Sequence, residues 1–178
     1  MIRLFAALAI PGDIGQEIAG HRQGLPGALW RPLEALHVTL RFAGDVPENQ
    51  GDDLDAELST IAGAPLNLSL GGVGVFGDGA DMRALWAGVE GGEALIRLAG
   101  RCETAARRAG LRAETRRWRP HVTLAYLRQV DPGAVAAWVQ DHNLLKSRAF
   151  QVAVFGLYSS WRGDDGAVYR LERTYRLG

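Results

Sequence analysis

The chain has 178 residues, of which 47% are hydrophobic and 22% are charged, a composition typical of a soluble globular protein. Lys and Arg together number 20, as do Asp and Glu, so the net charge provides no general attraction to a nucleic-acid backbone. Cys102 is the only cysteine, which excludes an internal disulfide and a cysteine-rich zinc site, and no apolar run is long enough to span a bilayer. We therefore expect a cytoplasmic protein with no cofactor and no metal.

Apolar periodicity and turn residues divide the chain into alternating helices and strands. The first half is predicted to form a strand over 2–10, a helix over 13–23, a strand over 37–43, a helix over 47–62, and strands over 66–70 and 84–89. The second half is predicted to form a helix over 93–109, a strand over 121–127, a helix over 132–143, and strands over 150–158 and 168–175. Both halves contain the order helix, strand, helix, two strands, which indicates an internal duplication with two lobes that share one cleft.

An identical string, His-Val-Thr-Leu, begins the middle strand of each half, at 37–40 and at 121–124. A given four-residue string recurs by chance in a chain of this length on the order of once in a thousand, at ordinary residue usage. Because side chains alternate across a strand, each copy places its histidine and its threonine on one face and its apolar residues on the other. The duplication therefore predicts two imidazoles and two hydroxyls that meet in the cleft.

The same alternation extends beyond each motif. It places Arg41 on the face of His37, and it places Phe42 and Tyr126 on the apolar faces. Arg41 and Arg119 are candidates for contacts with a phosphate or with the groups that flank it, with a solvated or ion-paired arginine as the alternative for each. Each of three tryptophans has two possible roles, as a platform on which a nucleobase stacks or as a packing residue: Trp30, Trp118 and Trp161.

Two histidines and two threonines suit the hydrolysis of a cyclic phosphodiester. One imidazole can activate water while the other protonates the leaving ribose oxygen, because histidine titrates near neutrality. The hydroxyls of Thr39 and Thr123 can donate to the non-bridging phosphate oxygens as negative charge builds up. A metal hydrolase using His37 and His121 is disfavoured, because no carboxylate or third histidine shares the motif strands.

A glycine-rich stretch, Gly72 to Gly77, matches the dinucleotide-binding pattern G-x-G-x-x-G. That pattern requires a helix to begin there, so that its N-terminus meets the pyrophosphate. Asp78 and Gly79 follow instead, and these residues favour a turn. We therefore expect a turn or loop at the rim of the groove, where Phe76 could stack on a base.

The sequence resembles the 2H phosphoesterase superfamily and, more closely, the RNA 2′,3′-cyclic phosphodiesterases, which are also called 2′-5′ RNA ligases. The paired motifs are specific to the superfamily, and the flanking blocks narrow the resemblance to this family. The resembling segments are Arg3–Leu8, Trp30–Val46, Phe76, Arg83–Gly88, Arg119–Ala125 and Leu157–Ser160, with Gly166 and Tyr169.

This resemblance implies an α+β fold that is bilobal and pseudo-twofold, with two antiparallel sheets facing a central cleft and helices outside, in one domain over 1–178. It implies hydrolysis of RNA 2′,3′-cyclic phosphate ends to 2′-phosphate ends, with His37 as the proton donor to the leaving oxygen and His121 as the acceptor from water. The alternatives are 2′-5′ RNA ligation, another 2′-5′ or cyclic phosphodiester substrate, and an RNA-end-binding module with little turnover. The expected partner is RNA with cyclic phosphate ends, tRNA fragments among them. We expect no membrane association and no obligate protein partner, and hence a monomer.

Overall fold

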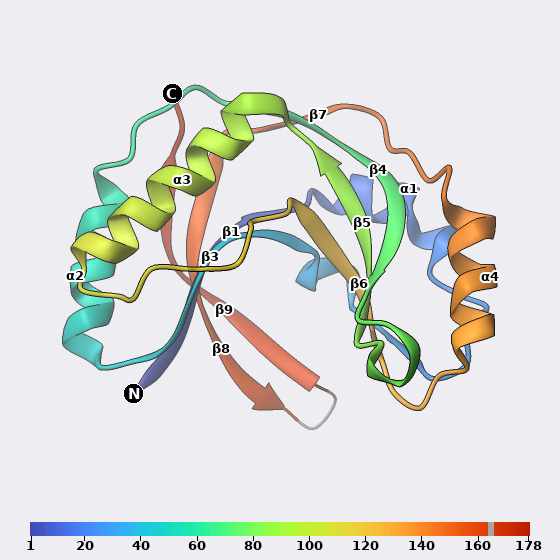
Figure 1. Ribbon diagram of the computed structural model, residues 1–178. Coiled ribbons are helices and arrows are strands. Elements are labelled where there is room, and N and C mark those ends of the chain that lie inside the picture. Colours follow the sequence, from blue (N-terminus) through green and yellow to red (C-terminus); the bar gives the residue numbers. More distant parts are fainter. Residues whose placement is uncertain (164–165) are drawn as a thin grey trace.

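The computed structural model describes residues 1–163 and 166–178. Within these residues, nine strands pair into one curved antiparallel sheet in the order β7-β4-β5-β6-β3-β1-β8-β9, with β2 added beside β6 (Figure 1). The strands are β1 (Ile2–Ala9), β2 (Ala28–Trp30), β3 (His37–Val46), β4 (Leu66–Phe76), β5 (Ala84–Glu90), β6 (His121–Leu127), β7 (Phe150–Val152), β8 (Val154–Gly163) and β9 (Gly166–Arg176). The helices are α1 (Gly12–Glu17), α2 (Glu48–Ser59), α3 (Gly92–Arg108) and α4 (Pro132–His142), with short 3₁₀ turns η1 (Ala19–His21), η2 (Leu33–Ala35) and η3 (Gly79–Asp81).

Two lobes form the sheet, with helices on their outer faces, as Figure 1 shows. The first lobe contains β3, β1, β8 and β9 beneath α2 and α3, and the second contains β6, β5, β4, β7 and β2 beneath α1 and α4. This arrangement confirms the predicted fold class, although the two expected sheets are halves of one continuous sheet. The lobes are not the two sequence halves, however, because β8 and β9 from the C-terminal half complete the first lobe.

The lobes meet at one residue pair, where Val38 of β3 pairs with Val122 of β6. These valines occupy equivalent positions in the two His-Val-Thr-Leu copies, so the pseudo-twofold relation passes through this pair. Continuing the antiparallel register by one residue in each direction places His37 across from Thr123, and His121 across from Thr39. His37 and His121 are diagonal neighbours in this register, and such neighbours lie roughly 7–8 Å apart. This separation leaves room for a phosphate between the imidazoles.

Helix α3 shows how the sequence pattern produces the packing of the first lobe. Its buried side chains include Leu95, Leu98, Cys102 and Ala106, which lie three or four residues apart and therefore on one helical face. A fully buried leucine contributes about 1.5–3 kcal/mol relative to an exposed one. Gly110 ends this segment with a φ of 80°, a left-handed conformation that favours glycine.

The predicted elements agree with the structure except in four places. The first helix ends at Glu17, and a 3₁₀ turn replaces its second half. The predicted strand over 150–158 is divided at Ala153, where the chain passes from β7 in the second lobe to β8 in the first. Strand β2 was not predicted, because three residues are too few for a periodic signal. The expected turn at 72–77 is wrong, since Gly72 to Phe76 continue β4 and pair with β5.

In the part of the chain that the structure describes, no helix combines the length and the apolar character needed to cross a bilayer.

Candidate active site

Each His-Val-Thr-Leu strand contains a β-bulge at its leucine. Ala7 of β1 pairs with Thr39 and Ala6 pairs with Arg41, so Leu40 has no partner across the strand. The same shift in the pairing of β5 with β6 leaves Leu124 without one. An extra residue of this kind reverses the alternation for everything beyond it. The bulges therefore determine which side chains share the face of the histidines and threonines.

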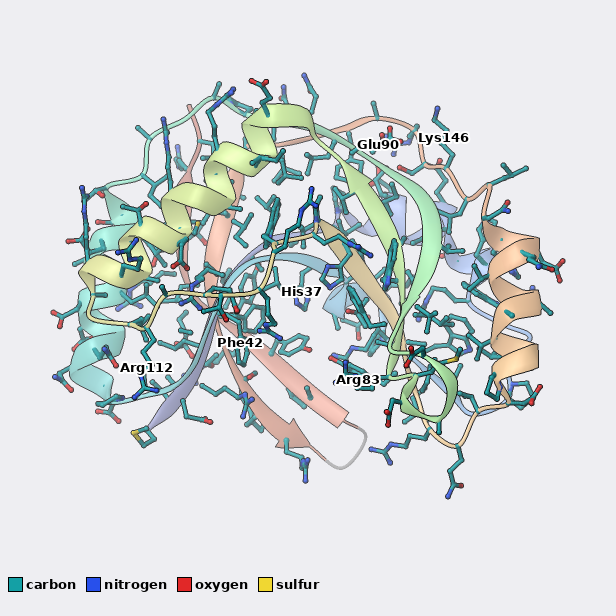
Figure 2. All side chains as sticks on the ribbon, in the orientation of Figure 1. His37, Phe42, Arg83, Glu90, Arg112 and Lys146 are labelled. Atoms are coloured by element: carbon teal, nitrogen blue, oxygen red, sulfur yellow. The ribbon has the colours of Figure 1, made fainter. Side chains whose placement is uncertain are left out.

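Beyond the bulges, the predicted faces of Arg41, Phe42 and Tyr126 are wrong. Phe42 pairs with Phe5, and Tyr126 pairs with Ala84, so these two aromatic rings share the faces of the histidines. Phe42 and Tyr126 are 38% and 40% exposed, so both rings are accessible on the histidine faces. Figure 2 shows His37 and Phe42 in the middle of the molecule, between the two lobes.

Arg41 points instead to the outer side of the first lobe. Its guanidinium forms an ion pair with Glu103 of α3 and donates to the backbone carbonyls of Phe42 and Arg112. Only 9% of its side chain is exposed. Figure 2 shows Arg112 at the outer edge of this lobe. These contacts make Arg41 part of the fold, and we do not include it among the proposed RNA contacts.

Both histidines are held by the same local hydrogen bond. The Nδ1 atom of His37 lies 2.8 Å from the carbonyl oxygen of Ala35, and that of His121 lies 2.7 Å from the carbonyl oxygen of Arg119. A carbonyl can only accept, so Nδ1 carries the proton in each ring. The Nε2 atoms are then the nitrogens available for acid–base chemistry.

Aromatic rings contact both imidazoles. The ring centroid of His37 lies 5.0 Å from that of Phe5 and 5.1 Å from that of Tyr169. The ring of His121 lies edge to face with Phe76 at 4.7 Å. Phe76 thus supports a histidine from the end of β4 instead of projecting from a turn, and its predicted stacking on a base stays a prediction.

Burial lowers the pKa of both histidines. For His37 the pKa falls to about 4, because burial together with the positive charge of Arg31 and the nearby His121 outweighs the hydrogen bond to Ala35. For His121 burial also lowers the pKa, and the positive charge of Arg119 adds to this effect. The neutral form of each imidazole is therefore favoured near pH 7.

The two threonines are available to a ligand. Thr39 and Thr123 are partly exposed on the histidine faces. Among the described residues, neither hydroxyl has a hydrogen-bond partner. The backbone carbonyl of Thr39 accepts a hydrogen bond from the Trp118 indole, at 3.0 Å, which fixes this part of β3. Trp118 is thus a packing residue in this structure.

Arg119 and Trp86 contact each other beside His121. The guanidinium carbon of Arg119 lies 5.7 Å from the centre of the Trp86 ring. Trp86 also covers Gly74, where a Cβ atom would lie 2.2 Å from the indole. Arg119 is exposed and close enough to His121 to affect its pKa. A contact between Arg119 and RNA stays a prediction.

Arg31 and Tyr169 are residues of the site that sequence reasoning missed. Arg31 follows β2, is only 6% exposed, and lies between the rings of Tyr126 and Tyr169. No sequence signal distinguishes a buried arginine from a surface one, so only the structure could reveal it.

Among the described residues, no group of three or more His, Cys, Asp or Glu side chains could hold a metal ion.

A family model described as the 2′-5′ RNA ligase superfamily matches residues 10–164, and the chain belongs to this superfamily. An RNA 2′,3′-cyclic phosphodiesterase of Archaeoglobus fulgidus is 27% identical over 177 residues, covering 98% of this chain and 99% of the relative. A protein of the same name from Bacillus subtilis is 35% identical over 127 residues, covering 68% of this chain and 69% of the relative.

Solved structures share the fold. Escherichia coli LigT complexed with 3′-AMP superposes with a TM-score of 0.79 at 23% identity, covering 99% of this chain and 98% of the other. The TT0787 protein of Thermus thermophilus superposes with a TM-score of 0.81 at 23% identity, with the same coverage of both chains. The likeness therefore extends over both lobes.

Proposed function

We propose that this protein hydrolyses RNA 2′,3′-cyclic phosphate ends to 2′-phosphate ends by metal-free general acid–base catalysis with His37 and His121. The observation that carries the proposal is the matched pair of Nδ1 hydrogen bonds to Ala35 and Arg119. These bonds leave two Nε2 atoms, each beside a threonine hydroxyl, at the seam between the lobes. The curated relatives of that name, which match over most of the chain, support the substrate class.

The proposed reaction uses these groups as follows. Nε2 of His121 accepts a proton from water, and the water oxygen attacks phosphorus. The bond between phosphorus and the 3′ oxygen breaks, while Nε2 of His37 donates a proton to that oxygen. The products are a 2′-phosphomonoester and a free 3′ hydroxyl, and proton exchange with solvent restores both imidazoles. The donor and acceptor roles come from the family resemblance, and Thr39 and Thr123 donate to the non-bridging oxygens.

The lowered pKa of His37 has a consequence for this scheme. A proton donor must be protonated when the substrate is bound, yet the empty site favours the neutral ring. A bound phosphate places negative charge beside the imidazole and thereby raises its pKa. Substrate binding and protonation of His37 are then coupled. We expect the rate to show a bell-shaped pH profile, whose two limbs belong to the pair of histidines as a unit.

The active unit in this proposal is the single bilobal domain over 1–178. It acts as a monomer in the cytoplasm, on RNA ends such as those of tRNA fragments. No protein partner is required for the chemistry, because the described chain supplies both histidines and both threonines.

One experiment tests the proposal. A short oligonucleotide ending in a 2′,3′-cyclic phosphate is incubated with the protein, with and without EDTA, and the product end is identified by its mass and phosphatase sensitivity. We expect a 2′-phosphate product and equal rates in both conditions. His37→Ala and His121→Ala should each reduce the rate at least about 100-fold. His142→Gln on α4, far from the cleft, is the matched control and should retain the full rate.

Each part of the proposal can fail separately. Activity that disappears in EDTA would show that a metal ion takes part. Tight binding of the oligonucleotide without turnover would favour an RNA-end-binding module. Near-normal rates in either alanine variant would refute the two-histidine mechanism.

A further inference from the structure

Arg31 is a buried arginine that lies outside both His-Val-Thr-Leu motifs. It is 6% exposed, and its Nη2 atom donates to the carbonyl oxygen of Ala167 in β9 at 3.0 Å. Its guanidinium carbon lies 5.4 Å from the centre of the Tyr126 ring and 5.1 Å from that of Tyr169. Two aromatic faces and one carbonyl thus fix the guanidinium where β6 and β9 approach each other.

Within the described residues, Arg31 has no carboxylate partner. Arg41 differs from Arg31 in this respect, because its guanidinium is also buried but pairs with the carboxylate of Glu103. Burial raises the pKa of Tyr169 to about 12, and the neighbouring Tyr126 adds to this effect, so the phenol stays neutral and supplies no negative charge. A buried cation without a counter-charge is costly, and a bound anion would supply the missing charge.

The position of Arg31 adjoins the two histidines. The ring of Tyr169 contacts Arg31 and also lies 5.1 Å from the ring of His37. Tyr126 follows the bulge at Leu124 and lies on the face of His121. Arg31 is also close enough to His37 for its charge to act on that imidazole. A ligand held by both Nε2 atoms would therefore lie beside the guanidinium.

We propose that Arg31, oriented by Tyr126 and Tyr169, forms an anion-binding site that takes the terminal phosphate of the RNA. The two rings hold the planar guanidinium and leave edge N–H groups for phosphate oxygens, a geometry that suits bidentate binding. The proposal names the phosphate contact of the proposed phosphodiesterase and rests on that function for the identity of the RNA. The site itself requires only a phosphate.

A preference among phosphates follows from the charge. A cyclic phosphodiester carries one negative charge, whereas a 2′-phosphomonoester carries close to two above pH 7. A fixed cation in a desolvated site attracts the doubly charged group more strongly. The product should therefore bind the free protein more tightly than the substrate and inhibit the reaction.

The test measures binding separately from turnover. Inorganic phosphate is titrated into the protein at pH 7.5, and the dissociation constant is obtained by calorimetry or from histidine side-chain NMR signals. Arg31→Met should weaken phosphate binding by about 10- to 100-fold, the range for a charged hydrogen-bonding group. Arg31→Lys keeps the charge without the planar fork and should fall between. Arg170→Met, which removes an exposed arginine of β9 that pairs with Glu172, should match the wild type within about twofold.

The outcomes distinguish this inference from the proposed function. Wild-type phosphate affinity in a folded Arg31→Met protein would overturn it and leave Arg31 as a structural tie to Ala167. If Arg31→Met does not fold, wild-type affinity in Arg31→Lys would overturn it equally. Phosphate binding that depends on Arg31, in a protein that does not hydrolyse cyclic phosphate ends, would support the site and refute the proposed function. A nucleoside 2′-monophosphate that inhibits the wild type strongly, Arg31→Lys more weakly and Arg31→Met least would support both.

Discussion

Replacing His37 with asparagine should alter the pH dependence of stability. The pKa of His37 is about 4 in the folded protein, chiefly because of burial, whereas an unfolded histidine titrates near 6.5. Between these values the unfolded chain binds the proton more readily than the folded chain does. The titration of His37 therefore does not lower the free energy of unfolding above about pH 6.5. This free energy falls as the pH decreases from about 6.5 towards 4.

The size of the effect follows from this shift. One pK unit corresponds to about 1.36 kcal/mol, so the full displacement is worth about 3 kcal/mol at the acidic end of the window. At pH 5, where most of the unfolded histidine and little of the folded one is protonated, the loss is about 2 kcal/mol. Asparagine does not titrate, and its amide can still donate to the Ala35 carbonyl. The variant therefore removes the titration with little change in the local hydrogen bond.

Urea denaturation at pH 5.0 and at pH 7.5 measures this difference. The free energy of unfolding of His37→Asn, relative to the wild type, should rise by about 2 kcal/mol when the pH falls from 7.5 to 5.0. His121→Asn should show a smaller change of the same sign, because its pKa is lowered less strongly. A change below about 0.5 kcal/mol for His37→Asn would show that His37 titrates normally in the folded protein, and the reasoning from burial would be refuted.

Three further substitutions test the site and its support. Arg41→Met should lower the free energy of unfolding by about 1–3 kcal/mol in urea, because Glu103 loses its partner, and should leave kcat and KM unchanged; a raised KM without a stability loss would contradict the structure. Thr123→Val should reduce kcat about 100-fold in single-turnover assays without affecting stability, and a loss below about threefold would remove the hydroxyl from the mechanism. Gly74→Ala places a Cβ atom 2.2 Å from Trp86 and should destabilise by about 1–3 kcal/mol, seen as a lower Tm. An unchanged Tm would mean that the indole moves aside freely.

The sequence was sufficient to predict the core of the site but not its extent. Strand alternation correctly paired each histidine with its threonine, because both residues precede the bulge. The predicted faces are wrong from Arg41 onwards, because the sequence does not distinguish a leucine at a bulge from a leucine in a regular strand. Leu40 and Leu124 are buried in either geometry, and only the pairing of neighbouring strands decides between them.

Long-range packing explains the remaining differences. Gly72 to Phe76 form a strand because β5 pairs with them, although their composition favours a turn. Arg31 is buried because Tyr126 and Tyr169 arrive from strands far along the chain. The lobes mix the two sequence halves for the same reason, as β8 completes the sheet beside β1. Periodicity describes one segment at a time and cannot report such partners.

The pairing of Val38 with Val122 means that backbone geometry, not side-chain length, sets the distance between the two proposed catalytic histidines. Each imidazole is held by a backbone hydrogen bond within its own lobe, whereas the distance between the two imidazoles depends on how the lobes are joined. Adapting this scaffold to a bulkier or smaller scissile group would thus call for remodelling the joint and leaving both motifs intact. In this architecture the proposed chemistry and the distance between the two imidazoles are separate properties, so selection or design can alter one without the other.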